Sequence, residues 1–304
     1  MQTTVVKPSR FEGFGLHSGR PARLTIRPAP AHHGIWFRRI DLDGNNMVPA
    51  RHDAVADARL CTLLVNESGT SISTVEHIMA ALWGCGVLNA IVEVDGPEIP
   101  ILDGSAADFV RGLLRTGIRK LSAPVHVIEV VRPITVRSDG ASASLTPAAE
   151  LEIDVEIEFA DRAIGHQRKV LRLSNGTFVR ELCDSRTFCC RADVDAMQAA
   201  GRALGGSLSN AVVVDGARVE NPEGFRHLDE AVRHKMLDVL GDLALAGAPI
   251  LGRYTGRRSG HALTARLLQA LFADPTAYRI RNLRLEEAGR LPGAGLEQDR
   301  FEHL

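Results

Sequence analysis

The chain has 304 residues, of which 45% are hydrophobic and 24% are charged; this ordinary globular composition excludes disorder, collagen and coiled coil. At roughly 100–200 residues per domain, the length predicts two domains. The 36 basic and 37 acidic side chains leave a formal net charge of -1, so we expect no nucleic-acid partner and no general binding to anionic membranes.

The first 19 residues lack the basic start and the apolar run of a secretory signal, and no apolar stretch is long enough for a transmembrane segment. The cysteines show neither framework spacing nor a CxxC pair: Cys61, Cys85, Cys183, Cys189 and Cys190. Such usage is typical of a reducing compartment. We therefore expect a cytoplasmic protein without a membrane span.

Short apolar runs and turn residues alternate in the first part of the chain. Apolar residues at every second position predict strands over 23–27, 34–38, 47–49 and 90–94. Residues 75–83 predict a buried helix with Ser73 or Thr74 as its N-cap. A second helix is predicted over 106–114.

After a plausible linker at 120–124, the pattern of strands and helices starts again. We expect strands over 125–131, 133–137, 141–145, 151–159, 168–172, 211–214 and 250–254, and helices over 178–182, 191–200, 230–245 and 261–273. Antiparallel strands before two helices in each half predict an α+β fold of two domains, 1–122 and 123–304, each a sheet layered with two helices. The tail from about residue 286 is expected to be loose.

The segment 230–245 carries the most informative polar pattern. His234, Asp238 and Asp242 are spaced at i, i+4 and i+8, so they share one face of the predicted helix. A histidine and an aspartate one turn apart can bind a common cation, and this donor pair suits Zn²⁺ or Fe²⁺. The alternative is a surface helix with a simple His–Asp contact.

Two further histidines are candidates. Glu76 and His77 lie in an otherwise apolar helix, where unpaired polar groups are costly; they are either a structural pair or part of a site. With His234 and Asp238, they complete the inventory of a catalytic zinc site between the domains: three ligands, one open position and a carboxylate base. His261 opens the last helix, whose dipole lowers its proton affinity while Asp242 would raise it; the alternative is a capping or core histidine.

Six segments, in this order along the chain, resemble one enzyme family: residues 15–19, 73–77, 98–105, 185–188, 232–238 and 259–263. The resemblance is to the UDP-3-O-acyl-N-acetylglucosamine deacetylases, and it extends from about residue 2 to residue 273. It implies zinc-dependent hydrolysis of the N-acetyl group of UDP-3-O-(3-hydroxyacyl)-N-acetylglucosamine, the committed step of lipid A biosynthesis in Gram-negative bacteria. The products would be acetate and the 2-amino sugar nucleotide.

The resemblance also implies residue roles. The metal ligands would be His77, His234 and Asp238, with Zn²⁺ as the cofactor and Fe²⁺ as an alternative in the cell. The catalytic residues would be the general base Glu76, the general acid His261, its orienting partner Asp242, and Thr187 at the oxyanion. Substrate would contact Lys235, Phe188, Leu60, Val194, Ala203, Gly206 and Ala211. We expect an acylated UDP-sugar as the partner and a monomer as the assembly.

An insert at about 188–214 would form the acyl passage. Val194, Met197, Ala203, Leu204 and Ala211 would line it, and Gly206 would leave its far end open to a long chain. The alternative is an ordinary turn in which glycine only supplies a positive φ.

The chain departs from the family pattern at two places. Cys189 and Cys190 follow Phe188, and we interpret them as small packing residues. Thr146 stands where relatives often carry a lysine, which weakens the expectation of diphosphate contacts there. Two rival functions stay open at this point: an iron oxygenase with a facial triad, and a binding protein or silent relative with a structural metal.

Overall fold

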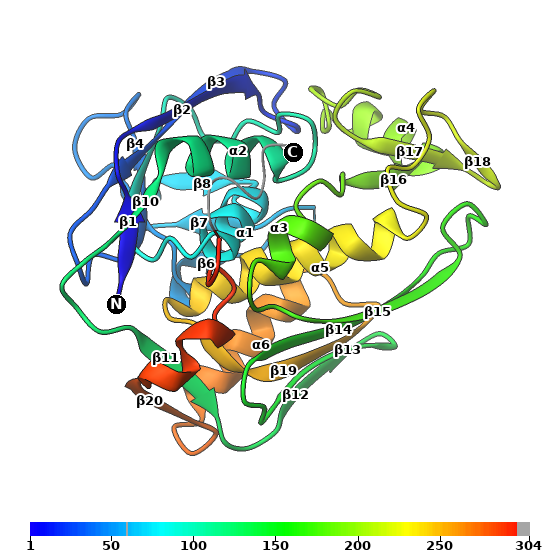
Figure 1. Cartoon of the computed structure of the whole chain (residues 1–304). Helices are drawn as coiled ribbons and strands as arrows, with labels where there is room; N and C mark the ends of the chain where they lie inside the picture. The colour runs from blue at the N-terminus through cyan, green and yellow to red at the C-terminus, as the bar shows by residue number, and fades with distance from the viewer. Residues whose placement is uncertain (59, 297–304) are drawn as a thin grey trace.

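Helices from both halves of the chain lie between two mixed β-sheets in the computed structural model, which describes residues 1–58 and 60–296 (Figure 1). This arrangement confirms the predicted α+β class. It also places the ends of helices from the two halves side by side, which is where the candidate site forms.

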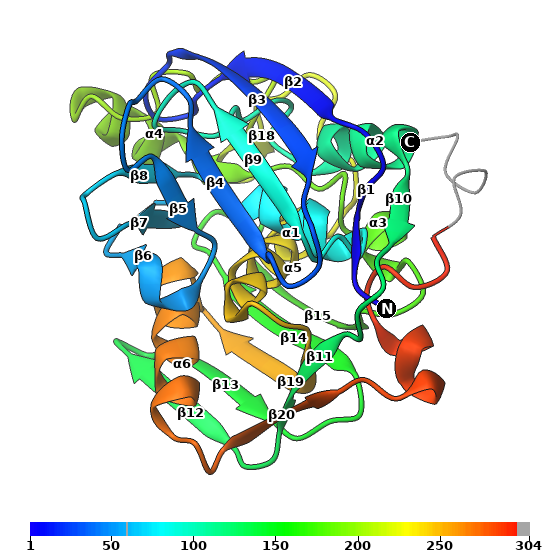
Figure 2. The same cartoon turned by 90° about the vertical axis from the view of Figure 1, so that its left-hand side faces the viewer.

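In the first half, five strands pair in the order β2-β3-β9-β4-β5. Their bounds are Ser9–Phe14 (β2), Pro21–Pro28 (β3), Ala90–Val94 (β9), Ile35–Arg39 (β4) and Met47–Pro49 (β5). Helices α1 (Glu76–Gly84) and α2 (Ala107–Thr116) pack behind this sheet (Figure 2). Smaller elements complete the half: β1 (Thr3–Val5) with β10 (Ile118–Lys120), η1 (His52–Ala54), and β6 (Val55–Ala56), β7 (Leu63–Val65) and β8 (Ser71–Ser73).

Every residue of α1 is buried, as its sequence predicted, because it lies between the first sheet and helix α5. The predicted cap is wrong. Val75 occupies the N-cap position and makes no side-chain cap bond. The hydroxyls of both candidates are used elsewhere: Ser73 donates to the carbonyl of Pro97, and Thr74 donates to the carboxylate of Glu98.

The second sheet is built around β19 (Ile250–Arg257). It pairs antiparallel with β13 (Ala141–Thr146) and parallel with both β14 (Leu151–Glu158) and β11 (His126–Val130). The outer strands are β12 (Ile134–Ser138), β15 (His166–Arg172) and β20 (Tyr278–Asn282). The sheet is therefore mixed rather than antiparallel as expected, because β19 is reached only after a long helical connection. The first sheet is mixed as well, since β4 runs parallel to β9.

Two helices cover the inner face of the second sheet: α5 (Glu230–Leu243), extended by η2 (Ala244–Ala246), and α6 (His261–Ala273). Helix α5 packs against α1, so it joins the two halves. The α5 face that carries His234, Asp238 and Asp242 is buried. It is not the solvent-exposed stripe that one reading of the spacing allowed.

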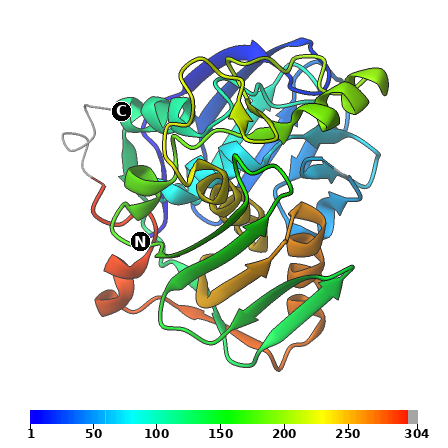
Figure 3. The ribbon, with the colours of Figure 1, turned by 90° about the vertical axis from the view of Figure 1, so that its right-hand side faces the viewer.

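A separate lobe leaves this core between β15 and α5. After α3 (Thr177–Glu181) it contains β16 (Phe188–Cys190), α4 (Arg191–Ala199), β17 (Val212–Asp215) and β18 (Arg218–Val219). The lobe stands at one edge of the molecule in Figure 1, and this side faces the viewer in Figure 3. Helix α4 has no buried residue. The lobe corresponds to the segment that the sequence marked as an insert.

The segment expected to be loose begins near η3 (Leu285–Arg290). In this region Glu287 is buried and accepts hydrogen bonds of 2.7 and 2.8 Å from the guanidinium of Arg281, so the start of the tail is held by charge pairing. Residues 297–304 of the predicted tail lie outside the described residues. Among the residues that the structure does describe, no helix has both the length and the apolar character of a membrane span.

Candidate metal centre and active site

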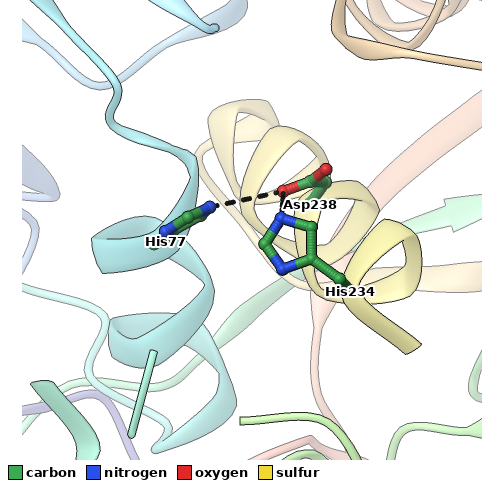
Figure 4. A group of neighbouring side chains, drawn as sticks. All are labelled: His77, His234 and Asp238. Carbon is green, nitrogen blue, oxygen red and sulfur yellow. Dashed lines mark ion pairs between the residues drawn. The ribbon is translucent and has the colours of Figure 1, made fainter. Parts of the chain in front are cut away.

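Helices α1 and α5 bring three metal-ligand side chains together. His77 comes from α1, while His234 and Asp238 lie one turn apart on α5 (Figure 4). One donor atom from each lies within 4.8 Å of the others. The Oδ1 atom of Asp238 is 3.7 Å from Nε2 of His77 and 3.3 Å from Nε2 of His234. The structure thus joins the three residues that the sequence pattern selected.

The ligand atoms of this group that lack hydrogen-bond partners are suited to bind a cation. Asp238 Oδ1 is buried and has no hydrogen-bond partner among the described residues, although the other oxygen accepts a 2.7 Å bond from Lys235. His234 uses Nδ1 to donate to the carbonyl of Ser185 at 3.0 Å, so Nε2 is left free. A buried carboxylate oxygen without a partner is costly, and a metal ion would satisfy it.

The protonation states also suit a metal. Burial, reinforced by the neighbouring His234, lowers the pKa of His77 to about 3. Burial likewise lowers the pKa of His234. For Asp238, burial alone would raise the pKa, but His234 when protonated and the Lys235 ammonium outweigh it and hold the pKa below its usual range. Two neutral imidazoles and one carboxylate are therefore ready to coordinate at neutral pH.

Glu76 lies beside the ligand group. Its Oε2 atom accepts a 3.0 Å hydrogen bond from the amide of Thr62, and its Oε1 atom is 3.9 Å from Nε2 of His261. Burial raises the pKa of Glu76 to about 7. A carboxylate with such a pKa can take up and release a proton near neutrality.

His261 faces Glu76 across the site. Its Nδ1 atom lies 2.9 Å from Oδ2 of Asp242, while its Nε2 atom points toward the carboxylates of Glu76 and Asp238. Burial alone would lower the pKa of His261, but these carboxylates, Asp242 foremost, raise it to about 9. The rise in pKa that the sequence suggested from Asp242 is therefore present, and it is large enough to overcome burial.

Sequence reasoning missed two residues of this centre. Thr62 bonds to both carboxylates that flank the histidine, through its amide to Glu76 and through its hydroxyl to Asp242 at 2.6 Å. No motif marked it, because the contact spans 180 residues of sequence. His17 belongs to a segment that the family resemblance included without a role. Its two ring nitrogens are buried without partners among the described residues, and the residue lines the cavity described next.

A cavity of about 770 Å³ opens over the metal-ligand group and runs into the lobe. Its lining includes Glu76, His261 and the three ligand residues, together with these predicted contact residues: Leu60, Thr187, Phe188, Val194, Ala203, Gly206, Ala211 and Lys235. Met197 lines it too. Leu204 does not, because its side chain is 57% exposed and turns to solvent. Asp242 stands behind His261 rather than on the cavity wall.

The residues after Arg186 form one wall of this cavity. The ring of Phe188 packs edge-on against Phe159 at 5.3 Å and lies 6.3 Å from the ring of His234. The amide of Thr187 donates to the carbonyl of Gly104 at 2.8 Å. Cys189 and Cys190 are half-buried in the same wall as free thiols, in keeping with a packing role.

Gly206 does not need a glycine's positive φ. Positive φ occurs instead at Ala203, with a value of 52°. A Cβ atom at position 206 would lie 3.1 Å from the carbonyl oxygen of Ala203 and 3.7 Å from the side chain of Leu16. The part of the turn explanation that rests on a positive φ is therefore wrong, although Gly206 does close a turn through a 3.1 Å bond from its amide to the carbonyl of Ala203. Thr146, the second departure, ends β13 and is not part of the described cavity lining.

The comparison with known proteins decides the family. A sequence profile described as LpxC, UDP-3-O-acyl N-acetylglycosamine deacetylase, matches residues 2–273. The chain belongs to this deacetylase family. A relative named UDP-3-O-acyl-N-acetylglucosamine deacetylase from Phenylobacterium zucineum (strain HLK1) is 47% identical over 281 residues, which cover 92% of this chain and 96% of the relative.

Two further relatives carry the same name. The protein of Anaeromyxobacter sp. (strain Fw109-5) is 48% identical over 282 residues, covering 93% of this chain and 92% of its own. The protein of Shewanella sp. (strain W3-18-1) is 43% identical over 281 residues, covering 92% of both. The similarity to these deacetylases thus spans both sheets, the lobe and the candidate metal centre.

Proposed function

We propose that this chain hydrolyses the N-acetyl group of UDP-3-O-(3-hydroxyacyl)-N-acetylglucosamine in the cytoplasm, as the committed step of lipid A biosynthesis. The products are acetate and the 2-amino sugar nucleotide. One observation carries the proposal: in a member of this deacetylase family, a ligand group, a carboxylate and a carboxylate-paired histidine converge on the same cavity.

The metal would be held by Nε2 of His77, Nε2 of His234 and Oδ1 of Asp238. These donors suit Zn²⁺, with Fe²⁺ as the alternative in the cell. When bound, the ion supplies Lewis acidity, which polarises the acetyl carbonyl and favours ionisation of water. The hydrogen bond from His234 Nδ1 to the Ser185 carbonyl fixes the orientation of that ring.

Glu76 acts as the general base. It accepts the proton from the water molecule that attacks the acetyl carbon, and the amide of Thr62 holds the carboxylate in place. The raised pKa of about 7 makes this transfer efficient at neutral pH. A carbon–oxygen bond forms as the proton leaves the water for Glu76.

His261 acts as the general acid. Asp242 holds its Nδ1 atom, so Nε2 donates the proton to the amide nitrogen as the carbon–nitrogen bond breaks. Thr187 stabilises the oxyanion of the tetrahedral intermediate. Because the amide of Thr187 already donates to Gly104, this contact falls to the hydroxyl.

The cavity wall would bind the remainder of the substrate. Lys235, Leu60 and Phe188 contact the sugar region, while the 3-hydroxyacyl chain follows Val194, Ala203, Gly206 and Ala211 into the lobe. We further propose a monomer of two domains, 1–122 and 123–304, with the active site between α1 and α5.

The rival functions account for less of the site. An iron oxygenase needs open metal positions more than a proton donor, so it leaves the His261–Asp242 pair without a role. A structural metal in a binding protein calls for a closed set of ligands. The ligand group found among the described residues has three members.

The test is acetate release from UDP-3-O-(3-hydroxyacyl)-N-acetylglucosamine by the purified protein, before and after chelation. We expect stoichiometric acetate and amino sugar nucleotide, loss of both on chelation, and recovery with Zn²⁺. A protein that binds Zn²⁺ at this centre and still releases no acetate would overturn the proposal.

A further inference from the structure

The family match and the cavity leave one buried carboxylate without a role. Glu98 precedes the extended segment that leads to Gly104, and only 3% of its surface is exposed. It lines neither of the two described cavities and makes no ion pair with any described residue. A buried glutamate without a cation is costly unless its oxygens accept several hydrogen bonds.

The two shorter of those hydrogen bonds come from the cavity loop at residues 15–18, and a third, of 3.3 Å, comes from the hydroxyl of Thr74. Glu98 Oε1 accepts a 2.7 Å bond from the amide of His17, and Oε2 accepts a 2.9 Å bond from the amide of Ser18. The carboxylate also fills the space beside Gly15, where a Cβ atom would lie 2.2 Å from Oε2. The main chain of the loop therefore packs closely against the Glu98 carboxylate.

The same loop holds the far end of the passage. The carbonyl of Leu16 accepts a 3.0 Å bond from the amide of Gly205, and the carbonyl of His17 accepts a 3.2 Å bond from the amide of Leu204. The contact is close: a Cβ atom on Gly205 would lie 2.3 Å from the carbonyl oxygen of Gly15. The first half of the chain thus fixes a turn of the lobe by main-chain bonds.

Inside the lobe, the buried side chain of Asn210 also supports this turn: its Nδ2 donates to the carbonyl of Gly205 at 2.9 Å, and its Oδ1 accepts a 2.8 Å bond from the amide of Ser207. The segments before the turn add little. Helix α4, which precedes it, has no buried residue, and Leu204 points to solvent. The turn itself supplies two cavity-lining residues, Ala203 and Gly206. Their positions therefore depend on the loop as well as on Asn210, and the loop is held by Glu98.

We propose that Glu98 is a positioning residue for acyl-chain selection: through the main chain of residues 15–18 it sets where the passage wall at 203–206 stands. Glu98 lines neither described cavity; its effect on the passage wall is carried by the loop. The proposal rests on the proposed function for its substrate, but the anchoring contact is a property of the protein by itself.

The experiment compares Glu98→Gln with Glu93→Gln. Glutamine keeps the size of the side chain but turns one acceptor into a donor that faces an amide. Glu93 is a matched control, because it is also buried but pairs with Arg27 and Arg38 on the first sheet. We expect kcat/KM for a long-chain 3-hydroxyacyl substrate to fall about tenfold more than for a short-chain one in Glu98→Gln, as a lost charged hydrogen bond implies. We expect no such split in Glu93→Gln.

Hydrogen exchange supplies a readout that needs no catalysis. The amides of Leu204 and Gly205 should exchange faster in Glu98→Gln, while those of α5 keep their wild-type rates. If Glu98→Gln does not fold, Gly205→Ala disrupts the same contact from the lobe side and should produce the same split. Unchanged exchange at 204–205 together with an equal loss on both substrates would overturn the proposal. If 204–205 exchange faster in Glu98→Gln but the wild-type protein releases no acetate, the anchoring contact stands and the proposed function is rejected.

Discussion

The candidate metal centre and the proposed acyl passage are supported in different ways. The centre rests on helices α1 and α5, where every functional side chain except Lys235 is buried and most have a partner within hydrogen-bond distance. The passage rests on a lobe whose helix α4 has no buried residue and whose turn is held by main-chain bonds to another part of the chain. Groups that transfer protons need fixed geometry, whereas a cavity wall that selects acyl chains by length needs only the right shape. Mutations should therefore abolish activity in the centre and redirect it in the passage.

The largest effect is expected from the metal ligands. His77→Ala or His234→Ala should lose both the bound metal and activity, because each removes one of three donors and leaves Asp238 buried without enough partners. Metal content by atomic absorption, together with acetate release, measures this. His166→Ala, at an exposed histidine, is the matched control. Full metal occupancy in the double variant His77→Ala, His234→Ala would refute the ligand assignment.

The next effect is expected at the general base. Glu76→Gln should lower kcat by about 10²–10⁴ while metal content stays unchanged. In the wild type, activity should rise with pH through about 7, as Glu76 loses its proton, and fall above about 9, as His261 loses its proton. The variant should lose the acidic limb of this bell. Wild-type kcat in Glu76→Gln would exclude the role.

A smaller effect is expected at Asp242, the partner of the proposed general acid His261. Asp242→Asn keeps the shape beside His261 but removes the charge that contributes most to raising its pKa. The basic limb of the pH–rate profile should therefore move to lower pH, and kcat at neutral pH should fall about tenfold. Asp215→Asn, at the exposed end of β17, serves as the control. A basic limb that stays in place would show that another group sets it.

The smallest effect on catalysis is expected in the passage. Gly206→Met adds a side chain at a cavity-lining glycine, where it would occupy part of the passage. The value of kcat/KM should therefore fall for a long-chain substrate and stay unchanged for a short-chain one. Each methylene that leaves the passage costs about 0.8 kcal/mol. An equal loss on both substrates would indicate damage to the turn rather than a blocked passage.

The sequence predicted the parts that depend on local pattern. Helix α6 begins and ends where its periodicity indicated, at His261 and Ala273, and β9 keeps its predicted bounds. The spacing of His234 and Asp238 placed two ligands on one helix face. The meeting with His77 depends on the packing of α1 on α5, which no local pattern shows; the inventory of a zinc site suggested it, and the family resemblance implied it.

The parts that failed depend on contacts between distant segments. Thr74 looked like an N-cap, yet its hydroxyl bonds to Glu98, 24 residues away. Thr62 bonds to both Glu76 and Asp242, but no local pattern shows a contact across 180 residues. Parallel pairing of β19 with β14 and β11 was missed for the same reason, because strand direction follows from the long helical connection.

The central place of β19 has a consequence for how the protein is made. The first sheet has all its strands once residue 94 has left the ribosome, whereas the second cannot close until residues 250–257 follow. Until α5 emerges, α1 has only α2 as a neighbouring helix, and the face that packs on α5 stays uncovered. Pairing across so many residues is slow and leaves unpaired edges exposed during synthesis. The nascent chain therefore passes through a long interval in which the first sheet can form while the second lacks its central strand, and His261, the proposed proton donor, is among the last parts of the site to arrive.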